Sequence, residues 1–277
     1  MWIPVSPLVT LTIAMLFPAD TAPTAGASAP PPAMTAPAHA PAPVAPPTSP
    51  KTPDMKGNVP AAQPAAPAPT DPKLDGVVDA MQKVYDGTTE FTGNFTQKYT
   101  YTLLRRTQES KGSVKFKKPG LMRWDYAAPA AKAFVVDGKS LWVYQPEDKN
   151  AFVNACFQQD GLTASVAFLW GQGKIKEQFG VAWFKGVFGE ATDNHLELTP
   201  KKPNAVFAKL IIVVDPKTSR VKQSIVVDPS GNVNQFIYND LKFNSGLGAK
   251  DFSFTPPTGT HVARMPGSCD APIAGVK

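Results

Sequence analysis

The sequence lacks the motifs that mark the common classes of enzyme. No GxSxG, GxGxxG or GxxxxGKS/T motif occurs, so there is no nucleophile elbow, dinucleotide-binding loop or P-loop. Only three histidines occur, and His195 and His261 do not stand at the spacing of metal ligands. No five basic residues follow one another, and the net charge of +6 is modest for 277 residues. We therefore expect no enzyme, no cofactor or metal, and no nucleic-acid partner.

The N-terminal part has no basic residue before Lys51. Leu8–Pro18 is an apolar run too short to cross a bilayer, and Ala25-Gly26-Ala27 has the small-x-small form of a cleavage site. These features predict an export signal over residues 1–27, although the usual positively charged start is missing. Residues 28–70 hold fourteen prolines and twelve alanines, a composition typical of an extended linker that forms no packed core.

Cysteine is scarce, since Cys156 and Cys269 are the only two in the chain. No cysteine stands near the expected cleavage site, where a lipidated protein needs one to carry its acyl chains. We therefore expect a protein that is exported and soluble and is not itself lipidated. An even pair of cysteines in an exported chain favours a disulfide between Cys156 and Cys269, and two free thiols are the alternative.

The folded part begins with a helix pattern. Asp71 and Pro72 are typical of a helix start, and Gly87 is typical of a helix end. Between them one apolar stripe repeats with the helical period, and it includes Val78 and Met81. The pattern predicts an amphipathic helix that packs on a sheet or faces a lipid.

After Gly87 the apolar period changes to two, which predicts strands. Lys118-Pro119-Gly120 and Asp137-Gly138 predict tight turns, and Asp215 and Asp228 are typical turn residues. The later strand patterns are Phe179–Phe184, His195–Leu198, Val206–Val214, Val221–Val227, Val233–Tyr238 and Phe252–Phe254.

One segment interrupts the strands. Leu162, Val166, Leu169 and Trp170 fit helical spacing, so Leu162–Trp170 is predicted to be a short inserted helix. About ten or eleven sequential strands predict an antiparallel meander that curls toward a barrel or half-barrel. The curled sheet needs a cover for its apolar concave face, and the two predicted helices are the candidates.

Four segments of this domain, in order, resemble the LolA family of periplasmic lipoprotein carriers. Each motif is weak alone, but together they extend over some 170 residues of the chain. The segments are Phe91–Gln97 (FTGNFTQ), Lys118–Tyr126 (KPGLMRWDY), Val136–Tyr144 (VDGKSLWVY) and Phe252–Val262 (FSFTPPTGTHV).

The resemblance implies a mainly β fold of the α+β type, an unclosed antiparallel half-barrel with the two helices as its lid. It implies a carrier domain over residues 71–265, followed by a tail at 266–277. Lys118 matches a basic residue, commonly Arg in the family, that holds the lid closed. We expect Val78, Met81, Leu162, Val166, Leu169 and Trp170 in the lid, and Phe95, Phe116, Met122, Trp124, Trp142 and Tyr144 in the lipid-binding cavity.

The resemblance also implies a function and its partners. Members of the family carry acylated lipoproteins across the periplasm. They load at an inner-membrane ABC-type release complex and unload to an outer-membrane acceptor. We expect a monomer that does the same. The alternative is a lipid- or lipoprotein-sensing domain of the same fold in envelope-stress signalling, although such sensors usually carry a second domain.

Overall fold

A computed structural model describes residues 71–157, 174–202 and 207–271 of the chain. The expected export signal, the proline-rich linker and the predicted inserted helix Leu162–Trp170 lie outside the described residues. Of the helices in the described ranges, none combines the length and the apolar character needed to cross a bilayer.

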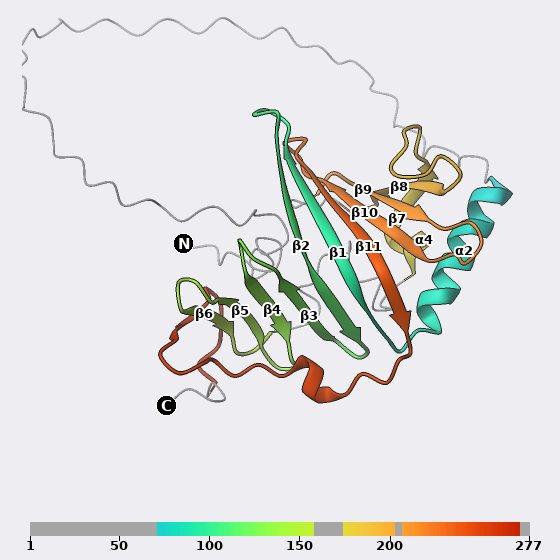
Figure 1. Cartoon of the computed structure of the whole chain (residues 1–277). Helices are drawn as coiled ribbons and strands as arrows, with labels where there is room; N and C mark the ends of the chain where they lie inside the picture. The colour runs from blue at the N-terminus through green and yellow to red at the C-terminus, as the bar shows by residue number, and fades with distance from the viewer. Residues whose placement is uncertain (1–70, 158–173, 203–206, 272–277) are drawn as a thin grey trace, which may run out of the picture. The chain divides into compact units, whose positions relative to one another are not determined.

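A single twelve-stranded sheet forms the body of the domain (Figure 1). Its spatial order is β12-β6-β5-β4-β3-β2-β1-β11-β10-β9-β8-β7, so β12 and β7 are its two edges and the sheet is not closed. Within the described ranges, three helical segments accompany it: α2 (Pro72–Asp86), α4 (Ile175–Gln178) and the 3-10 helix η3 (Ala249–Phe252). The strands are β1 (Glu90–Tyr101), β2 (Arg106–Lys117), β3 (Leu121–Tyr126), β4 (Lys132–Val136), β5 (Leu141–Gln145), β6 (Asn150–Asn154), β7 (Phe179–Trp183), β8 (Asn194–Pro200), β9 (Lys209–Val214), β10 (Val221–Val227), β11 (Val233–Phe243) and β12 (His261–Arg264).

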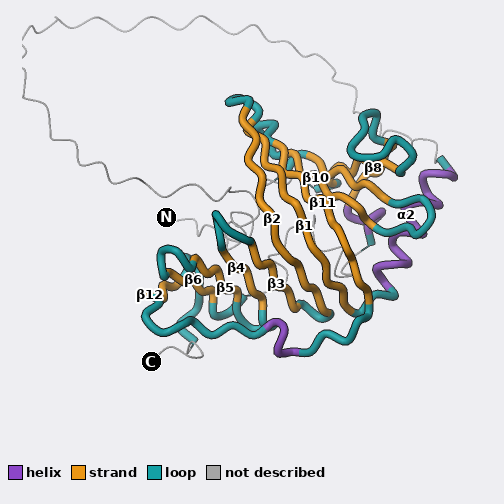
Figure 2. Tube along the Cα trace, viewed as in Figure 1, coloured by secondary structure: helices purple, strands orange, loops and turns teal. Residues whose placement is uncertain are grey.

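The predicted fold class, a mainly β open half-barrel, is confirmed. Successive strands pair antiparallel from β1 to β6 and from β7 to β11, as a meander requires. The pairing of β1 with β11 joins the two runs into one sheet. In Figure 2, β1, β11 and the neighbouring β2 are the long strands in the middle of the sheet.

The end of the chain differs from the prediction in two respects. Residues Phe252–Phe254 form no strand, since Phe252 ends η3, and the last strand is His261–Arg264. This strand pairs with β6 in parallel, so the sheet is not antiparallel throughout. The N–H of Ser253 donates to the carbonyl of Lys250 at 3.3 Å, so it closes the end of η3 and not a strand pairing.

The predicted ends of the first helix are confirmed. One carboxylate oxygen of Asp71 accepts hydrogen bonds from the N–H groups of Lys73 (2.9 Å) and Leu74 (3.3 Å), which have no partner inside the helix. At the other end, the N–H of Gly87 donates to the carbonyl of Lys83 at 3.1 Å. Figure 1 shows α2 beside the half of the sheet that contains β7 to β11.

The predicted turns also form. The Asp137 carboxylate accepts from the N–H groups of Lys139 and Ser140 between β4 and β5. In the same way, Asp215 accepts from two N–H groups of the β9–β10 turn, and Asp228 from two of the β10–β11 turn. These aspartates therefore stabilise the turns through side-chain hydrogen bonds, as their place in the sequence predicts.

Apolar side chains are buried on both faces of the sheet. We call the face on which α2 packs the inner face, and the other the outer face. The outer face has two small clusters, one centred on Trp142 and Val153 and one on Ile211 and Ile225. The inner face has one large cluster, whose sheet residues include Phe91, Phe95, Val114, Phe116, Met122, Trp124, Tyr126, Phe134, Val136, Leu141, Phe179, Leu196, Leu198, Leu210, Ile212, Val214, Val221 and Phe236.

A glycine makes room for the Phe95 ring of this cluster. A Cβ atom on Gly112 would lie 2.1 Å from the carbonyl oxygen of Asp125 and 2.8 Å from two ring atoms of Phe95. Both distances are far below van der Waals contact. Gly112 therefore lets the Phe95 ring lie flat against β2, at the centre of the inner face.

A disulfide joins Cys156, just after β6, to Cys269, just after β12. The two cysteines are 113 residues apart in sequence. The bond therefore fixes the C-terminal segment at the same edge of the sheet where β12 pairs with β6.

We predict that Gly112→Ala destabilises the protein by about 1–3 kcal/mol, because the methyl group forces the Phe95 ring and the β2–β3 pairing to move. Urea unfolding followed by circular dichroism measures the effect. Gly180→Ala is the matched control, since its added Cβ meets nothing closer than the Thr199 carbonyl at 3.9 Å. Equal midpoints for the two variants would contradict this account of Gly112.

Removal of the disulfide should also lower stability. On the chain-entropy model, a closed loop of this length contributes about 4–5 kcal/mol by restricting the unfolded chain. The double variant Cys156→Ser/Cys269→Ser should thus unfold at a much lower urea concentration than the oxidised protein. The reduced wild type should match the double variant, and a reductant that leaves the oxidised midpoint unchanged would show that the bond contributes nothing.

Candidate functional site

The inner face is built around aromatic rings. Because alternate residues of a strand point to one face, β1, β3 and β11 each direct rings to the same place. The ring of Phe95 lies 4.9 Å from those of Trp124 and Tyr126 and 5.9 Å from that of Phe236, between centroids. Edge-to-face contacts of this kind pack tightly without polar partners. The centre of the inner face is thus a continuous apolar surface.

Four of the six predicted cavity residues lie together in this cluster. Phe95, Phe116, Met122 and Trp124 come from three adjacent strands, and each is at most 2% exposed. The strands β1, β2 and β3 hold them in register, with Phe116 opposite Met122 and Val114 opposite Trp124. Whether these residues contact lipid stays a prediction.

The prediction for Trp142 and Tyr144 is wrong, because both lie on the outer face. Trp142 pairs with Val135 and belongs to the outer cluster, whereas its neighbour Leu141 belongs to the inner one. The Phe254 ring covers both residues, at 5.3 Å from each ring. Apolar residues occupy both faces of β5, so alternation in the sequence could not show which side faces inward.

Sequence reasoning left further aromatic residues of the inner face out of the predicted cavity, among them Tyr126, Phe134 and Phe236. For Tyr126 a signal was present, since it stands two residues after Trp124 in the same strand. Phe134 and Phe236 could be assigned to this face only from the pairing of their strands with β3 and β1.

One basic side chain also lies on the inner face. Lys132, the first residue of β4, is partly buried, and its ammonium lies 4.5 Å from the centre of the Tyr126 ring. Burial lowers the pKa of Lys132 to about 8, because the charged form loses water. The apolar surface therefore has a cation at one end.

The helix α2 contributes the described part of the predicted lid. Val78 and Met81 are fully buried in the inner cluster, together with Tyr85. The lid residues predicted in the inserted helix, Leu162, Val166, Leu169 and Trp170, lie outside the described residues. The apolar stripe of α2 thus packs on the sheet, as its period predicts.

Lys118 reaches the C-terminal end of α2. Its ammonium donates to the backbone carbonyls of Tyr85 at 2.6 Å and Asp86 at 3.3 Å. The last carbonyls of a helix have no partner inside it and carry partial negative charge, so a cation is favourable there. Burial lowers the pKa of Lys118, and the negative charge of Asp86 acts in the opposite direction. The contact joins the β2–β3 turn to the helix.

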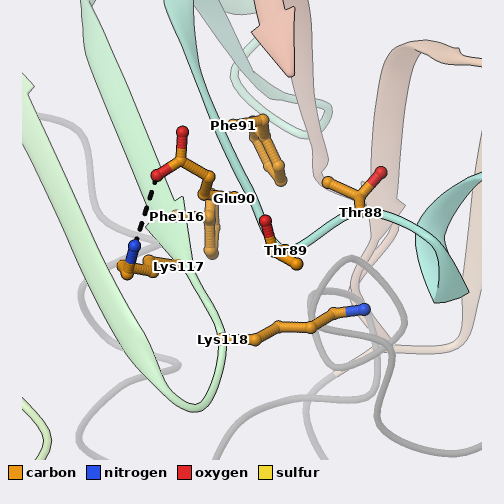
Figure 3. Close-up of a pocket in the computed structure, with 7 residues that line it drawn as sticks. All are labelled: Thr88, Thr89, Glu90, Phe91, Phe116, Lys117 and Lys118. Atoms are coloured by element: carbon orange, nitrogen blue, oxygen red, sulfur yellow. Dashed lines mark hydrogen bonds and ion pairs between the residues drawn. The ribbon is translucent and has the colours of Figure 1, made fainter. Parts of the chain in front are cut away.

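A small pocket lies at this junction (Figure 3). Its cavity volume is about 10 Å³, which is room for about one water molecule. In Figure 3, Lys118 extends under the chain around Thr88, and Lys117 reaches the Glu90 carboxylate. The pocket marks the joint between helix and sheet and is too small for a long acyl chain.

Polar contacts also hold α2 elsewhere. The indole N–H of Trp183 donates to the Asp71 carboxylate at 2.7 Å, and the hydroxyl of Tyr85 accepts from the N–H of Val221 at 3.1 Å. Lys176 of α4 lies 3.0 Å from Asp75 and 2.7 Å from Asp79. The helix is therefore fastened by hydrogen bonds and ion pairs, while its middle makes only apolar contacts with the sheet.

No catalytic or metal-binding arrangement accompanies these groups in the ranges that the structure describes. There, no three His, Cys, Asp or Glu side chains gather into a possible metal site. The ring of His195 forms a 2.9 Å hydrogen bond with the carbonyl oxygen of Phe188. The described site is an apolar face of the sheet that the helix α2 partly covers.

Residues 86–255 match the family model "Outer membrane lipoprotein carrier protein LolA". An outer-membrane lipoprotein carrier protein of Nitrosomonas europaea is 30% identical over 174 residues, covering 63% of this chain and 82% of the relative. That of Pseudomonas aeruginosa strain PAO1 is 28% identical over 157 residues, covering 57% and 73%. A solved LolA superfamily structure from Nitrosomonas europaea has a TM-score of 0.36 at 15% identity, covering 65% and 97%.

We predict that Lys118→Met loosens the end of α2, because two helix carbonyls lose their charged donor. The helix end should lose about 1 kcal/mol of stability, and not more, since the Lys118 ammonium is partly exposed to water. Amide hydrogen exchange at Val84–Thr88 should become about five times faster in the ligand-free protein. Lys139→Met, at an exposed turn, is the control. Unchanged exchange in Lys118→Met would show that Lys118 does not hold the helix.

Proposed function

The chain belongs to the LolA family of outer membrane lipoprotein carrier proteins, and we propose that it carries acylated lipoproteins between the two membranes. In this proposal it is exported to the periplasm and takes lipoproteins from an inner-membrane ABC-type release complex. It then delivers them to an acceptor at the outer membrane, acting as a carrier and not as an enzyme. Family membership supports the proposal, as does one observation on the site. That observation is a large apolar face of the sheet on which the helix buries Val78, Met81 and Tyr85.

The need for a carrier follows from the cost of exposing acyl chains. Each methylene group transferred to water costs about 0.8 kcal/mol, so three chains of roughly sixteen carbons cost tens of kcal/mol. A lipoprotein therefore does not cross an aqueous compartment unaided. A protein that buries the chains removes this barrier without any chemical step.

The lid gives the carrier two states. When it is empty, Val78, Met81 and Tyr85 cover part of the inner face and exclude water from it. An entering acyl chain takes their place, and the apolar side of the displaced helix then covers the chain. Because apolar contact is not directional, the exchange needs no exact fit and can run in both directions.

The fastening of α2 sets the balance between these states. Loading must break the contacts of Lys118 with the Tyr85 and Asp86 carbonyls, and release restores them. A weak fastening favours loading, whereas a strong one favours release. Lys118 has one ammonium, where an arginine would offer a planar fork to the two carbonyls. In this proposal the lysine makes loading easier than an arginine would.

The proposal predicts that acyl binding depends on the inner face alone. Val114 of the inner face and Val135 of the outer face are both fully buried. Val→Thr at either site puts a hydroxyl into an apolar cluster, so both variants should lose similar stability. Only Val114→Thr should lower the release of radiolabelled lipoproteins from spheroplasts into the medium, by about fivefold.

The wild type must release lipoproteins in the same assay, and urea unfolding checks that the two variants are equally stable. A wild-type protein that stays empty beside spheroplasts would refute the carrier function and favour the sensor alternative. Equal loss of release in Val114→Thr and Val135→Thr would refute the assignment of the inner face.

A further inference from the structure

The inner face contains a hydrogen-bond donor that is buried and unsatisfied. The indole N–H of Trp124 has no acceptor among the residues that the structure describes, and the side chain is 2% exposed. Its ring neighbours are Phe95 at 4.9 Å and Phe236 at 5.1 Å. Buried polar groups in native proteins nearly always have a partner, so this donor requires an explanation. An oxygen atom of a bound ligand would provide the missing acceptor.

A cation lies next to this donor on the same face. In the β3–β4 pair, Trp124 is opposite Phe134 and Tyr126 is opposite Lys132. Trp124 and Lys132 are therefore diagonal neighbours, whose separation in antiparallel pairs is about 7–8 Å. The ammonium of Lys132 lies over the rings of Tyr126 and Phe134, at 4.5 Å and 5.6 Å from their centres. Both rings belong to the inner cluster, so the charge lies at its margin.

We propose that Trp124 and Lys132 together bind the oxygen-bearing head of an acyl chain, which is a carboxylate or an ester carbonyl. The indole N–H donates to one oxygen, and the ammonium attracts the full negative charge of a carboxylate or the partial negative charge of an ester oxygen. The rings of Phe95, Phe116 and Phe236 surround the chain that follows. Apolar contact alone cannot distinguish the two ends of a chain. The polar pair therefore fixes the direction in which the chain lies on the inner face.

This inference deepens the proposed function and rests on it, because it requires that the inner face binds acyl chains. The probes share one twelve-carbon chain and differ in the head. Dodecanoate offers a carboxylate, monododecanoylglycerol an ester carbonyl, and dodecyltrimethylammonium a cation without a hydrogen-bond acceptor. Titration calorimetry of the full-length protein, below the micelle concentration of each probe, measures the three affinities.

Wild-type protein should bind dodecanoate about tenfold more tightly than dodecyltrimethylammonium, as expected for a charge-assisted hydrogen bond. Lys132→Met should reduce this preference severalfold, since the Trp124 donor remains. Trp124→Phe should lower the affinity for dodecanoate and for monododecanoylglycerol severalfold. Its affinity for dodecyltrimethylammonium should equal that of wild type. The controls are Lys139→Met, at an exposed turn, and Trp142→Phe, on the outer face. Both controls should behave as wild type.

The outcomes separate this inference from the function on which it rests. Equal binding of the three probes by wild type would overturn the polar pair and leave the acyl-binding face intact. Binding of none of them would overturn the proposed function, and the inference with it. If Lys132→Met affects only dodecanoate, the natural ligand has an anionic head. If the ester binds as tightly as dodecanoate and depends on Trp124 alone, the ligand is an acylated glyceride.

Discussion

An open sheet with an apolar inner face must keep water from that face, and this constraint governs the rest of the structure. A closed barrel would bury its interior by itself, but here β12 and β7 are free edges of the sheet. The helix α2 supplies part of the cover through Val78, Met81 and Tyr85. Its burial is hydrophobic and therefore exchangeable, because another apolar surface can replace it at little cost. The proposed carrier function requires a cover of this exchangeable kind.

The polar contacts that join α2 to the sheet and its turns lie at the ends of the helix, whereas those along its length are with α4. In the proposed function, the apolar middle determines how well the helix competes with an acyl chain. The end contacts, Lys118 with two helix carbonyls and Asp71 with Trp183, would then determine where the helix returns when the chain leaves. Hydrogen bonds are directional, whereas apolar contact is not. One helix can thus be loosely held and still have a defined closed position.

Much of this arrangement could be predicted from the sequence, wherever local chemistry decides the structure. The Asp71 cap, the Asp137-Gly138 hairpin and the alternation of Met122 and Trp124 each depend on a few neighbouring residues. The predictions were wrong where contacts between segments far apart in the sequence decide the structure. Trp142 faces outward because Phe254, more than a hundred residues later, covers it, and the last strand pairs in parallel with β6. Lys132 was missed because only its pairing with Tyr126 places it on the inner face.

The account depends most on the displacement of α2 by a bound acyl chain. Lys83 on the helix and Lys139 at the β4–β5 turn are both exposed, and the native cysteines are bonded to each other. Spin labels on Lys83→Cys and Lys139→Cys therefore report the distance between helix and sheet by double electron–electron resonance. We predict one narrow distance in the empty protein and a longer, broader distribution after loading with lipoprotein. An unchanged distance in protein shown to hold lipoprotein would contradict the account.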